Sequence, residues 1–447
     1  MKFSRRKFIV RSAGLAAAPW IVPASVLGGG GATPPSERIT IGFIGVGAPE
    51  NGMGTTNMLQ FIGLDDCRVV AGCDVDAEHL RLFVDSVNRR NGDTACRGYG
   101  NFRELLARDD IDAVCISTPD HWHGIIALAA LKAGKDVYGE KPIAHTFTEG
   151  QRIVEAVERH RRIWQTGSWQ RSQFNFRQAC ELVRNGMIGK VARVEVGLPS
   201  GHRDIPREEY ERLAADWNRP PHLDYETWIG PGPMKPYCAA RMHKNWRWDL
   251  DFGGGQLMDW IGHHNDIAHW GLGLDESGPM QVQATGRFPP RDALWHSPTS
   301  FEVRCHYVGG LEVLIRDAPP VPRGGTARDG HFQGTKWIGS DGWVHVDRGR
   351  LEAHDPRLLK APLDASAVRL EVSNHHWRQF LDCVRSRRQA LAPAHVAHRS
   401  ITPGHLAHVS MELGRAVRWD PDGQRVIDDN RAQELLTAVS MRSPWSL

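Results

Sequence analysis

The sequence predicts an α/β fold in two domains. The N-terminal domain should carry a parallel sheet, and the C-terminal α+β domain a large, open, mainly antiparallel sheet. In the first third of the chain, strands of buried type alternate with helical stretches, and a glycine turn follows the first strand. Beyond residue 168 the pattern changes to segments with alternating apolar and polar residues. We expect the first domain to span 37–168 and the second 169–447.

The first element is a strand within residues 38–47, which is rich in β-branched and apolar residues and ends in Gly45-Val46-Gly47. Such a turn is typical of a dinucleotide-binding site. The first glycine allows the tight turn, and the second lets the backbone approach a pyrophosphate at a helix N-terminus. Glu50 holds the position expected for the third glycine, so we expect a longer turn. A glycine pair alone also fits an ordinary β-turn, and the following elements decide between the two.

The second strand, 68–74, ends in an acidic residue, Asp74. In dinucleotide-binding folds a carboxylate at this place accepts hydrogen bonds from the adenosine ribose and repels a 2′-phosphate. Asp74 could instead cap the next helix, although Asp76 is better placed for that role. We therefore expect NAD, with NADP as the alternative.

Polar residues also follow the next two strands. One strand leads into Thr118 and Pro119, and another, 136–139, leads into Glu140 and Lys141, with a helical stretch between them. The carboxyl ends of parallel strands meet at one edge of a sheet, and ligands bind there. We expect these residues to lie beside the glycine turn.

A glycine-rich segment far along the chain precedes Asp259 and His263. Their spacing of four places both side chains on one helical face. Carbinol oxidation beside a hydride acceptor needs a lysine, a histidine that takes the hydroxyl proton and a carboxylate that orients it. Taken singly, Lys141 could be a solvated strand-end residue and the other two a core pair. Their joint occurrence favours catalysis.

The remaining elements follow from the same periodicities. We expect strands at 163–167, 191–196, 301–307, 311–315 and 335–338, a hairpin turn at 340–342, and helices at 256–270, 375–387 and 403–417. Between 200 and 250 the chain is rich in prolines and tryptophans, including Trp248. Flat aromatic faces suit sugar C–H groups, although most tryptophans are core residues.

Several of these motifs together resemble the Gfo/Idh/MocA family of sugar and polyol oxidoreductases. The matching segments are the glycine turn, 118–123, Glu140-Lys141-Pro142, 169–171 and the glycine-rich helix with Asp259 and His263. The resemblance extends almost to the C-terminus and implies an N-terminal Rossmann domain for NAD(P). Gly262, directly before His263, departs from the family's usual spacing, which bears on helix packing more than on chemistry.

The resemblance also implies site residues. It assigns catalysis to Lys141, Asp259 and His263. It implies cofactor contacts from Gly45, Val46, Gly47, Asp74, Thr118, Pro119, His123, Glu140, Lys141 and Gln170. Substrate contacts are expected from Lys141, Arg171, Trp248, Asp259 and His263. A packing or capping role for His123 is nearly as well supported. A tightly bound cofactor and a homo-oligomer formed through the C-terminal sheet are further expectations.

Composition narrows the function classes. The chain has 447 residues, a formal net charge of +3 and no basic run beyond the extreme N-terminus, so nucleic acid is not expected as a partner. The eight cysteines are dispersed without a C-x-x-C motif, which favours buried thiols. His263 and His264 point to different helix faces and no other ligand set has metal spacing, so no metal is expected.

The first residues predict an export signal. Paired arginines, Arg5 and Arg6, precede an apolar stretch, as in a twin-arginine signal covering residues 1–31. A basic disordered tail is the alternative. The apolar stretch is too short for a confident membrane span. We therefore expect a periplasmic or otherwise exported protein.

The sequence thus favours an exported NAD(P)-dependent oxidoreductase that transfers hydride between nicotinamide and a hydroxyl carbon of a sugar, polyol or glycoside. One alternative is an NAD-dependent glycoside-cleaving enzyme, in which transient oxidation acidifies a neighbouring C–H bond and permits elimination. Another is a non-catalytic sugar-binding protein of the same fold. The joint presence of Lys141, Asp259 and His263 argues against the latter.

Overall fold

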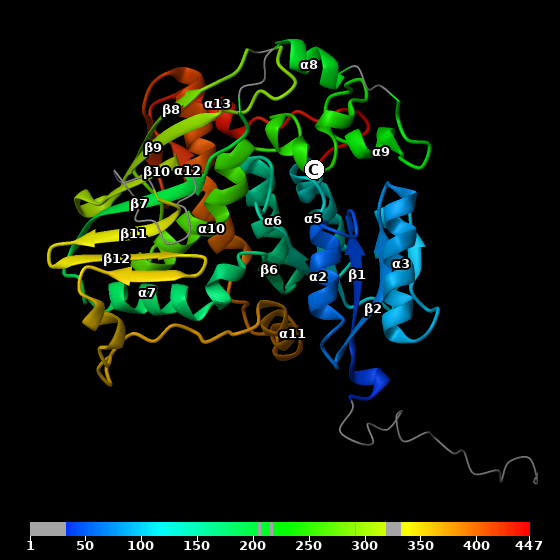
Figure 1. Cartoon of the computed structure of the whole chain (residues 1–447), viewed down its shortest axis with the longest axis horizontal. Coiled ribbons are helices and arrows are strands. Elements are labelled where there is room, and N and C mark those ends of the chain that lie inside the picture. The colour runs from blue at the N-terminus through cyan, green and yellow to red at the C-terminus, as the bar shows by residue number, and fades with distance from the viewer. Residues whose placement is uncertain (1–32, 204–206, 215–217, 291, 319–331) are drawn as a thin grey trace, which may run out of the picture.

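The fold is described from a computed structural model that covers residues 33–203, 207–214, 218–290, 292–318 and 332–447. The predicted export signal lies outside these described residues. Two sheets, with helices between and around them, make up the structure (Figure 1).

The N-terminal sheet has six strands in the order β3-β2-β1-β4-β5-β6, all parallel. The strands are β1 (Ile39–Ile44), β2 (Cys67–Cys73), β3 (Arg97–Tyr99), β4 (Ala113–Ile116), β5 (Asp136–Gly139) and β6 (Trp164–Thr166). The helices between them are α2 (Met53–Phe61), α3 (Ala77–Asn91), α4 (Phe102–Leu106), α5 (His123–Lys132) and α6 (Phe147–His160). This is the predicted Rossmann arrangement, and β1 lies at its centre.

Local signals explain where these helices begin and end. Asp76 caps α3 by accepting hydrogen bonds from the backbone N–H groups of Glu78 and His79, both at 3.0 Å. This confirms Asp76 as the better cap candidate. Thr146 and Glu149 form a reciprocal capping box at the start of α6. Such caps satisfy backbone donors that the first helical turn leaves without partners.

In the described residues the C-terminal sheet has nine strands in the order β13-β12-β11-β7-β10-β9-β8-β14-β15. Among these strands only the pair β7 and β10 is parallel, so the sheet is mainly antiparallel, as predicted. Its strands are β7 (Val191–Pro199), β8 (Gln281–Arg287), β9 (Ser300–His306), β10 (Glu312–Ala318), β11 (Gly334–Gly339), β12 (Gly342–Asp347), β13 (Arg350–Ala353), β14 (Val417–Asp420) and β15 (Arg425–Val426). The remaining helices are α7 (Phe174–Arg184), α8 (Arg207–Ala214), α9 (Tyr225–Ile229), α10 (Gly255–Leu272), α11 (His376–Ser386), α12 (Ala394–Leu413) and α13 (Asn430–Thr437).

The two faces of this second sheet differ in chemistry. Val194 and Val196 on β7 are fully buried. They alternate with Arg193, which pairs with Glu195 at 3.1 Å and with Glu312 of the neighbouring strand at 3.6 Å. Such alternation is expected where one face packs on helices and the other does not. The predicted subunit contact through this charged face stays a prediction.

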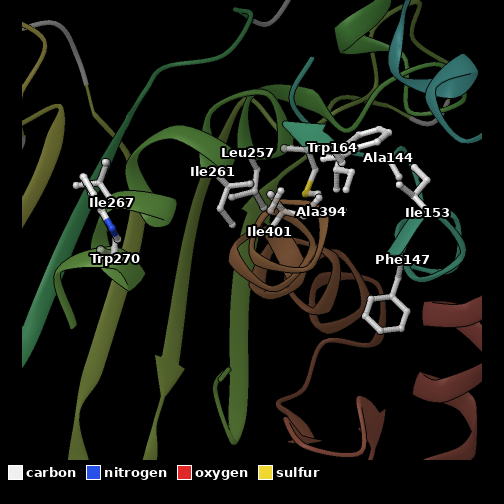
Figure 2. Packing of buried hydrophobic residues seen from close by; sticks show 14 of the residues in the cluster. Ala144, Phe147, Ile153, Trp164, Leu257, Ile261, Ile267, Trp270, Ala394 and Ile401 are labelled. Carbon is white, nitrogen blue, oxygen red and sulfur yellow. The ribbon is translucent and has the colours of Figure 1, made fainter. Parts of the chain in front are cut away.

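Helices α10 and α12 lie between the two sheets (Figure 1). Leu257 and Ile261 on α10 pack against Ala394 and Ile401 on α12, and Trp164 of the first sheet belongs to the same buried apolar group (Figure 2). One continuous core therefore joins the two domains, and it holds α10 against the nucleotide-binding half.

The expectation for α12 was wrong at its N-terminus. The helix begins at Ala394 and continues through Pro403, where the sequence predicts a start. Proline in a helix interior removes one backbone hydrogen bond, a cost of about 3 kcal/mol. The buried positions before it, such as Val396 and Ile401, show that tertiary packing outweighs this cost. Gly414, with a φ of 64°, ends the helix.

Helix α11 packs on the first sheet, although it follows most of the second domain in sequence. Phe380 contacts Phe61 and Tyr138 edge to face, with ring centroids 6.0 and 5.9 Å apart. Arg378 and Arg385 both pair with Asp66 next to β2. If the domain boundary is drawn at residue 168, helix α11 is therefore assigned to the second domain, although it packs on the sheet of the first.

Within the described part of the chain, no helix combines the length and apolar character needed to cross a bilayer.

Candidate active site

The glycine turn lies directly after β1, at the carboxyl edge of the parallel sheet. Gly45 and Gly47 have positive φ values of 81° and 67°, which L-residues with a Cβ rarely adopt. A Cβ on Gly45 would also lie 2.7 Å from the backbone nitrogen of Thr118. The turn and the end of β4 are thus in close contact, as predicted for residues at one sheet edge.

Gly54 takes the place of the displaced third glycine. Helix α2 begins only at Met53, so the turn is longer than usual, as predicted. A Cβ on Gly54 would lie 2.1 Å from the carbonyl oxygen of Gly45. This close helix–turn approach is the role of the third glycine in a dinucleotide-binding fingerprint.

Asp74 points back at the glycine turn. Its Oδ2 accepts hydrogen bonds from the backbone N–H groups of Val46 at 2.9 Å and Gly47 at 3.0 Å, and its Oδ1 accepts from Asp76 at 2.9 Å. Burial raises the pKa of Asp74, and these donors act in the opposite direction. Asp74 therefore organises the turn. Oδ2 already accepts two hydrogen bonds, whereas Oδ1 accepts one and still has a lone pair for a ribose hydroxyl, so that predicted role stays a prediction.

Thr118 and Pro119 follow β4 and adjoin the turn. The Thr118 hydroxyl is buried and has no hydrogen-bond partner among the described residues. His123, at the start of α5, has Nε2 2.9 Å from the carbonyl oxygen of Thr118 and Nδ1 2.7 Å from that of Pro142. His123 thus ties together the ends of β4 and β5. Both ring nitrogens face backbone carbonyl oxygens, and the neutral ring donates to one of them, which supports a positioning role beside the predicted cofactor contact.

Glu140 is also turned inward. It is buried, and its Oε1 accepts a hydrogen bond of 2.9 Å from the Asn57 side chain. Burial raises the pKa of Glu140, and the charge of Lys141 acts against this. The residue therefore anchors the strand end that carries Lys141, and its predicted cofactor contact stays a prediction.

Lys141, Asp259 and Arg247 form a tight ionic cluster. The Lys141 Nζ lies 2.8 Å from Oδ1 of Asp259 and 3.0 Å from its carbonyl oxygen, and the Arg247 Nε lies 3.0 Å from the same Oδ1. Burial acts to raise the pKa of Asp259, but the two cations outweigh it and lower the pKa well below its usual range. Residues 118 positions apart thus meet at one point.

His263 lies next to this cluster on α10. Its ring contacts Trp169 and Trp260, with centroids 6.1 and 5.4 Å apart, and its buried Nδ1 has no partner among the described residues. Burial, followed by the charge of Lys141, lowers the pKa of His263 well below the usual value. The imidazole is therefore neutral at pH 7 and has a nitrogen available.

The predicted link between Asp259 and His263 is wrong in this structure. The carboxylate is directed at Lys141 and Arg247, and no hydrogen bond from His263 to it is found among the described residues. The two cations compete more strongly for a carboxylate than a neutral ring does. Asp259 consequently orients Lys141 instead of the imidazole.

Arg171 is buried in an ion-pair network, and its predicted substrate contact stays a prediction. It is 2 % exposed and donates to Asp266 at 2.7 and 2.9 Å and to Asp275 at 2.8 Å. An arginine paired in this way holds α10 in place and has little surface for a ligand. Its neighbour Gln170 donates to Nδ1 of His264 at 3.3 Å, while its Oε1 is buried without a partner among the described residues.

Trp248 packs against His202 with the rings tilted at 48° and their centroids 5.5 Å apart. The adjacent Arg247 is the residue that reaches Asp259, and sequence reasoning missed it. Reasoning from the sequence also missed Asp120, which is buried beside this cluster. Burial raises the pKa of Asp120 to about 7. Its place within the 118–123 motif is the signal that could have found it.

Across the described residues, one group has the spacing of metal ligands: Asp249, Asp251 and His296. Lys235 lies 2.9 Å from Asp249, and Arg241 lies 3.0 Å from it. Two cationic side chains already neutralise this carboxylate, so the group is explained by ion pairs.

Comparison with known families matches both halves of the chain. Residues 39–168 match the family described as "Oxidoreductase family, NAD-binding Rossmann fold". Residues 172–318 and 362–447 match its "C-terminal alpha/beta domain". The chain belongs to the Gfo/Idh/MocA oxidoreductase family. The resemblance drawn from the motifs is thereby confirmed, together with the NAD-binding Rossmann domain.

Among the curated relatives of this Gfo/Idh/MocA family member are proteins named as glycosidases. A "Glycosyl hydrolase family 109 protein" of Shewanella baltica is 31% identical over 168 residues, 36% of this chain and 35% of that protein. Its namesake in Shewanella pealeana is 30% identical over 216 residues, 44% of this chain and 46% of that protein. The similarity therefore covers less than half of each relative's length.

Solved structures share the fold over most of the chain. An aldose-aldose oxidoreductase from Caulobacter crescentus, complexed with glycerol, is 18% identical with a TM-score of 0.60 and covers 85% of this chain and 99% of its own. The WlbA dehydrogenase from Bordetella pertussis, in complex with NADH and UDP-GlcNAcA, is 18% identical with a TM-score of 0.60 and covers 86% and 100%. At these identities the likeness shows the fold alone.

The residues at the sheet edge fit a dinucleotide. Gly45, Gly47 and Gly54 lie so close to neighbouring backbone that a Cβ would not fit, which gives the tight turn and helix approach of a dinucleotide site. The hydroxyl of Thr118 and the amide oxygen of Gln170 are buried without partners among the described residues. Unpartnered buried polar atoms are rare in native proteins and mark places where a ligand or water binds.

Proposed function

We propose that the protein transfers hydride between NAD and a hydroxyl carbon of a carbohydrate. One observation carries the proposal. The Lys141 Nζ, fixed by Asp259 at 2.8 Å, lies at the carboxyl edge of the Rossmann sheet, next to His263 with its unpartnered Nδ1. Parallel sheets bind nucleotides at this edge, so a hydroxyl carbon placed there would face the nicotinamide.

Lys141 has a free donor for the substrate. An ammonium group has three N–H bonds, and Asp259 accepts two of them, through its carbonyl oxygen and its Oδ1. The third can donate to the substrate hydroxyl and stabilise the partial negative charge that develops on its oxygen during oxidation. Asp259 and Arg247 hold the lysine in this orientation.

His263 can take the hydroxyl proton. Its ring is neutral and its Nδ1 is free of protein partners among the described residues. General-base catalysis requires a basic atom within hydrogen-bond reach of the proton that it removes. NAD, when bound, supplies the hydride acceptor. In the reverse direction, His263 returns the proton to the oxygen.

The test uses the unmodified protein with NAD and a panel of sugars, polyols and glycosides. Oxidation should yield one NADH for each carbonyl formed. The proposal fails if nicotinamide cofactor does not bind, or if no carbohydrate of the panel reduces it or turns over.

A second candidate, glycoside cleavage with hydride returned to the product, is favoured by the glycosidase name of the curated relatives. The same Lys141 and His263 would serve its oxidation step. Release of the leaving group from a glycoside without accumulation of NADH supports this candidate over net oxidation. Stoichiometric NADH supports the first.

We infer that NAD is preferred over NADP. A carboxylate about 4 Å from a phosphate charge costs on the order of 4 kcal/mol at an effective dielectric of about 20, so Asp74 should disfavour a 2′-phosphate. Titration of cofactor-stripped protein should show tighter binding of NAD. Tighter binding of NADP by the unmodified protein would refute this role of Asp74.

Two variants separate the charge of Asp74 from its structural role. Asp74→Asn keeps an oxygen for the N–H groups of Val46 and Gly47 but removes the charge, so it should narrow the gap between NAD and NADP. Asp74→Ser also loses contacts with the turn and should weaken both cofactors as well. An unchanged ratio of affinities in the Asn variant would show that the charge does not select the cofactor.

We further infer export through a twin-arginine signal, because Arg5 and Arg6 precede an apolar stretch. Replacing both by lysine should trap the precursor in the cytoplasm, as measured by fractionation of the producing cells. An unchanged yield outside the cytoplasm would mean that the segment is not such a signal.

A further inference from the structure

Arg348 lies in the turn between β12 and β13, against two tryptophans of the candidate active site. Its Cζ is 4.3 Å from the ring centroid of Trp169 and 4.4 Å from that of Trp260. Cation–π contacts of this kind hold a guanidinium in place more firmly than a single solvated ion pair does. The hairpin of the second sheet thus brings a positioned cation to helix α10.

The two tryptophans also contact His263, so Arg348 is one ring away from the proposed base. The electrostatic couplings agree with this placement. Burial lowers the pKa of Arg348 to about 10, and the charge of Asp259 acts against this. The charge of Arg348 in turn contributes, after burial and Lys141, to the lowered pKa of His263. Arg348 as a whole residue is exposed, while Asp259 and the two indoles are half-buried, so part of the Arg348 side chain remains open to solvent beside the catalytic cluster.

Arg348 differs from the other arginines near the site in what its N–H groups meet. Arg171 donates to two carboxylates and Arg247 donates to Asp259. For Arg348, no carboxylate or other acceptor is found in the described segments, and its contacts there are the two indole rings. A guanidinium has five N–H donors, all of which remain for solvent or a ligand.

The charge balance points in the same direction. Lys141 and Arg247 share a single carboxylate, that of Asp259, and Arg348 adds a further positive charge on the same side. Burial raises the pKa values of the nearby Glu140 and Asp120, which weakens their compensation. An anionic group on the substrate would offset this excess.

We propose that Arg348 binds the carboxylate of a sugar acid or of a glycoside of one, so that the substrate of this site is anionic. The proposal rests on the proposed function and specifies its substrate class. The indole rings contact the guanidinium around its Cζ, and its N–H groups have no acceptor among the described residues, so they are left for a ligand. A carboxylate matches such an edge with two parallel hydrogen bonds.

The experiment compares matched acid and neutral sugars. Binding of D-glucuronate, D-galacturonate, D-glucose and D-galactose to the NADH-loaded protein is measured by titration calorimetry. A charge-assisted pair contributes about 1.5–3 kcal/mol, so at least one acid should bind about tenfold or more tightly than its neutral counterpart. Arg348→Gln should abolish this ratio, and Arg348→Lys should retain part of it.

Arg350→Gln is the matched control, because Arg350 begins β13 of the same hairpin and lies 3.9 Å from both Asp347 and Glu352. This variant should keep the preference for acids. If Arg348 only stabilises the hairpin, Arg348→Gln should lower the melting temperature while acids still bind more tightly than their neutral counterparts. That result overturns the proposal. Equal binding of all acids and their neutral counterparts overturns it too.

The failure of this inference is distinct from that of the proposed function. NADH binding and oxidation of neutral sugars depend on the glycine turn, Lys141 and His263, and are measured separately. A protein that oxidises neutral sugars without favouring acids refutes the role of Arg348 alone, whereas a protein that binds no nicotinamide cofactor refutes both.

Discussion

Replacing Lys141 by methionine should lower kcat/KM by about two to three orders of magnitude. The loss is that expected when a single donor to a developing oxyanion is removed, because the third N–H of Nζ is the group directed at the substrate. Methionine keeps most of the side-chain volume, and Arg247 still pairs with Asp259 at 3.0 Å. NADH affinity should change little, so the effect falls on the chemical step.

Lys135→Met offers a matched control at the other end of the same strand. Lys135 lies directly before β5 and donates to the carbonyl oxygens of Arg108 at 2.6 Å and Ile111 at 2.9 Å. Its loss should lower the melting temperature and leave turnover by the folded protein intact. Near-normal activity of the Lys141 variant would sink the assigned mechanism, and His263→Ala gives an independent check of it.

Acidification should unfold the protein over a narrow range near pH 5. Burial lowers the pKa of several histidines relative to the usual 6.5. The values are about 3 for His121 and His264 and about 4 for His123, His269, His376 and His398. Because the folded-state pKa lies below that of the unfolded chain, the unfolded chain binds more protons as the pH falls below about 6.5. Stability is therefore retained above that pH and lost on the way to pH 4.

The expected effect is large. A histidine with a folded-state pKa of about 4 lowers the protein's free energy of unfolding by about 2 kcal/mol at pH 5. Six such groups would together lower the stability by on the order of 10 kcal/mol, against the 5–15 kcal/mol typical of a folded protein. The buried carboxyls of Asp120 and Glu149, whose pKa values burial raises to about 7, act in the opposite direction and offset part of this loss. Guanidinium titrations followed by tryptophan fluorescence at several pH values measure this directly.

Single substitutions show which histidines cause the loss of stability at acid pH. His398→Met removes a buried histidine that packs against Phe147, with centroids 4.9 Å apart, and should shift the acid transition to lower pH. His306 on β9 is exposed, so His306→Met should leave the transition where it is. Stability that does not fall between pH 6.5 and 5 would contradict the neutral state of the buried rings.

Local patterns were enough to predict most of the strands, the glycine turn and the positions of Lys141, Asp259 and His263, but the strands β3, β8, β13, β14 and β15 were missed. Each predicted feature depends on residues adjacent in sequence or on one helical face. The partner of Asp259 could not be predicted in this way, because Arg247 reaches it through the fold of a loop-rich segment without a periodic signal. No sequence pattern predicts a role for Arg348 either, because only the pairing of β12 with β13 brings it to Trp260.

Arg171 shows the opposite limit. Its place next to Gln170 in a family motif suggested a ligand contact, but the pairing with Asp266 and Asp275 was not predictable from local pattern and supports a structural role. The predicted start of helix α12 was wrong for a related reason. Proline marks a helix start by local rules, but the buried residues before Pro403 pack well enough to extend the helix through it.

Because α11 packs on the first sheet, the order of synthesis limits when the nucleotide-binding half can finish folding. The ribosome makes β1 to β6 first and reaches Phe380 only after β7 to β13. Until then the rings of Phe61 and Tyr138, which Phe380 covers, remain open to water. The nucleotide-binding half therefore reaches its final form late in synthesis. A fragment ending at residue 168 would keep those rings uncovered and is expected to aggregate, whereas adding the α11 segment back as a separate peptide should restore its solubility.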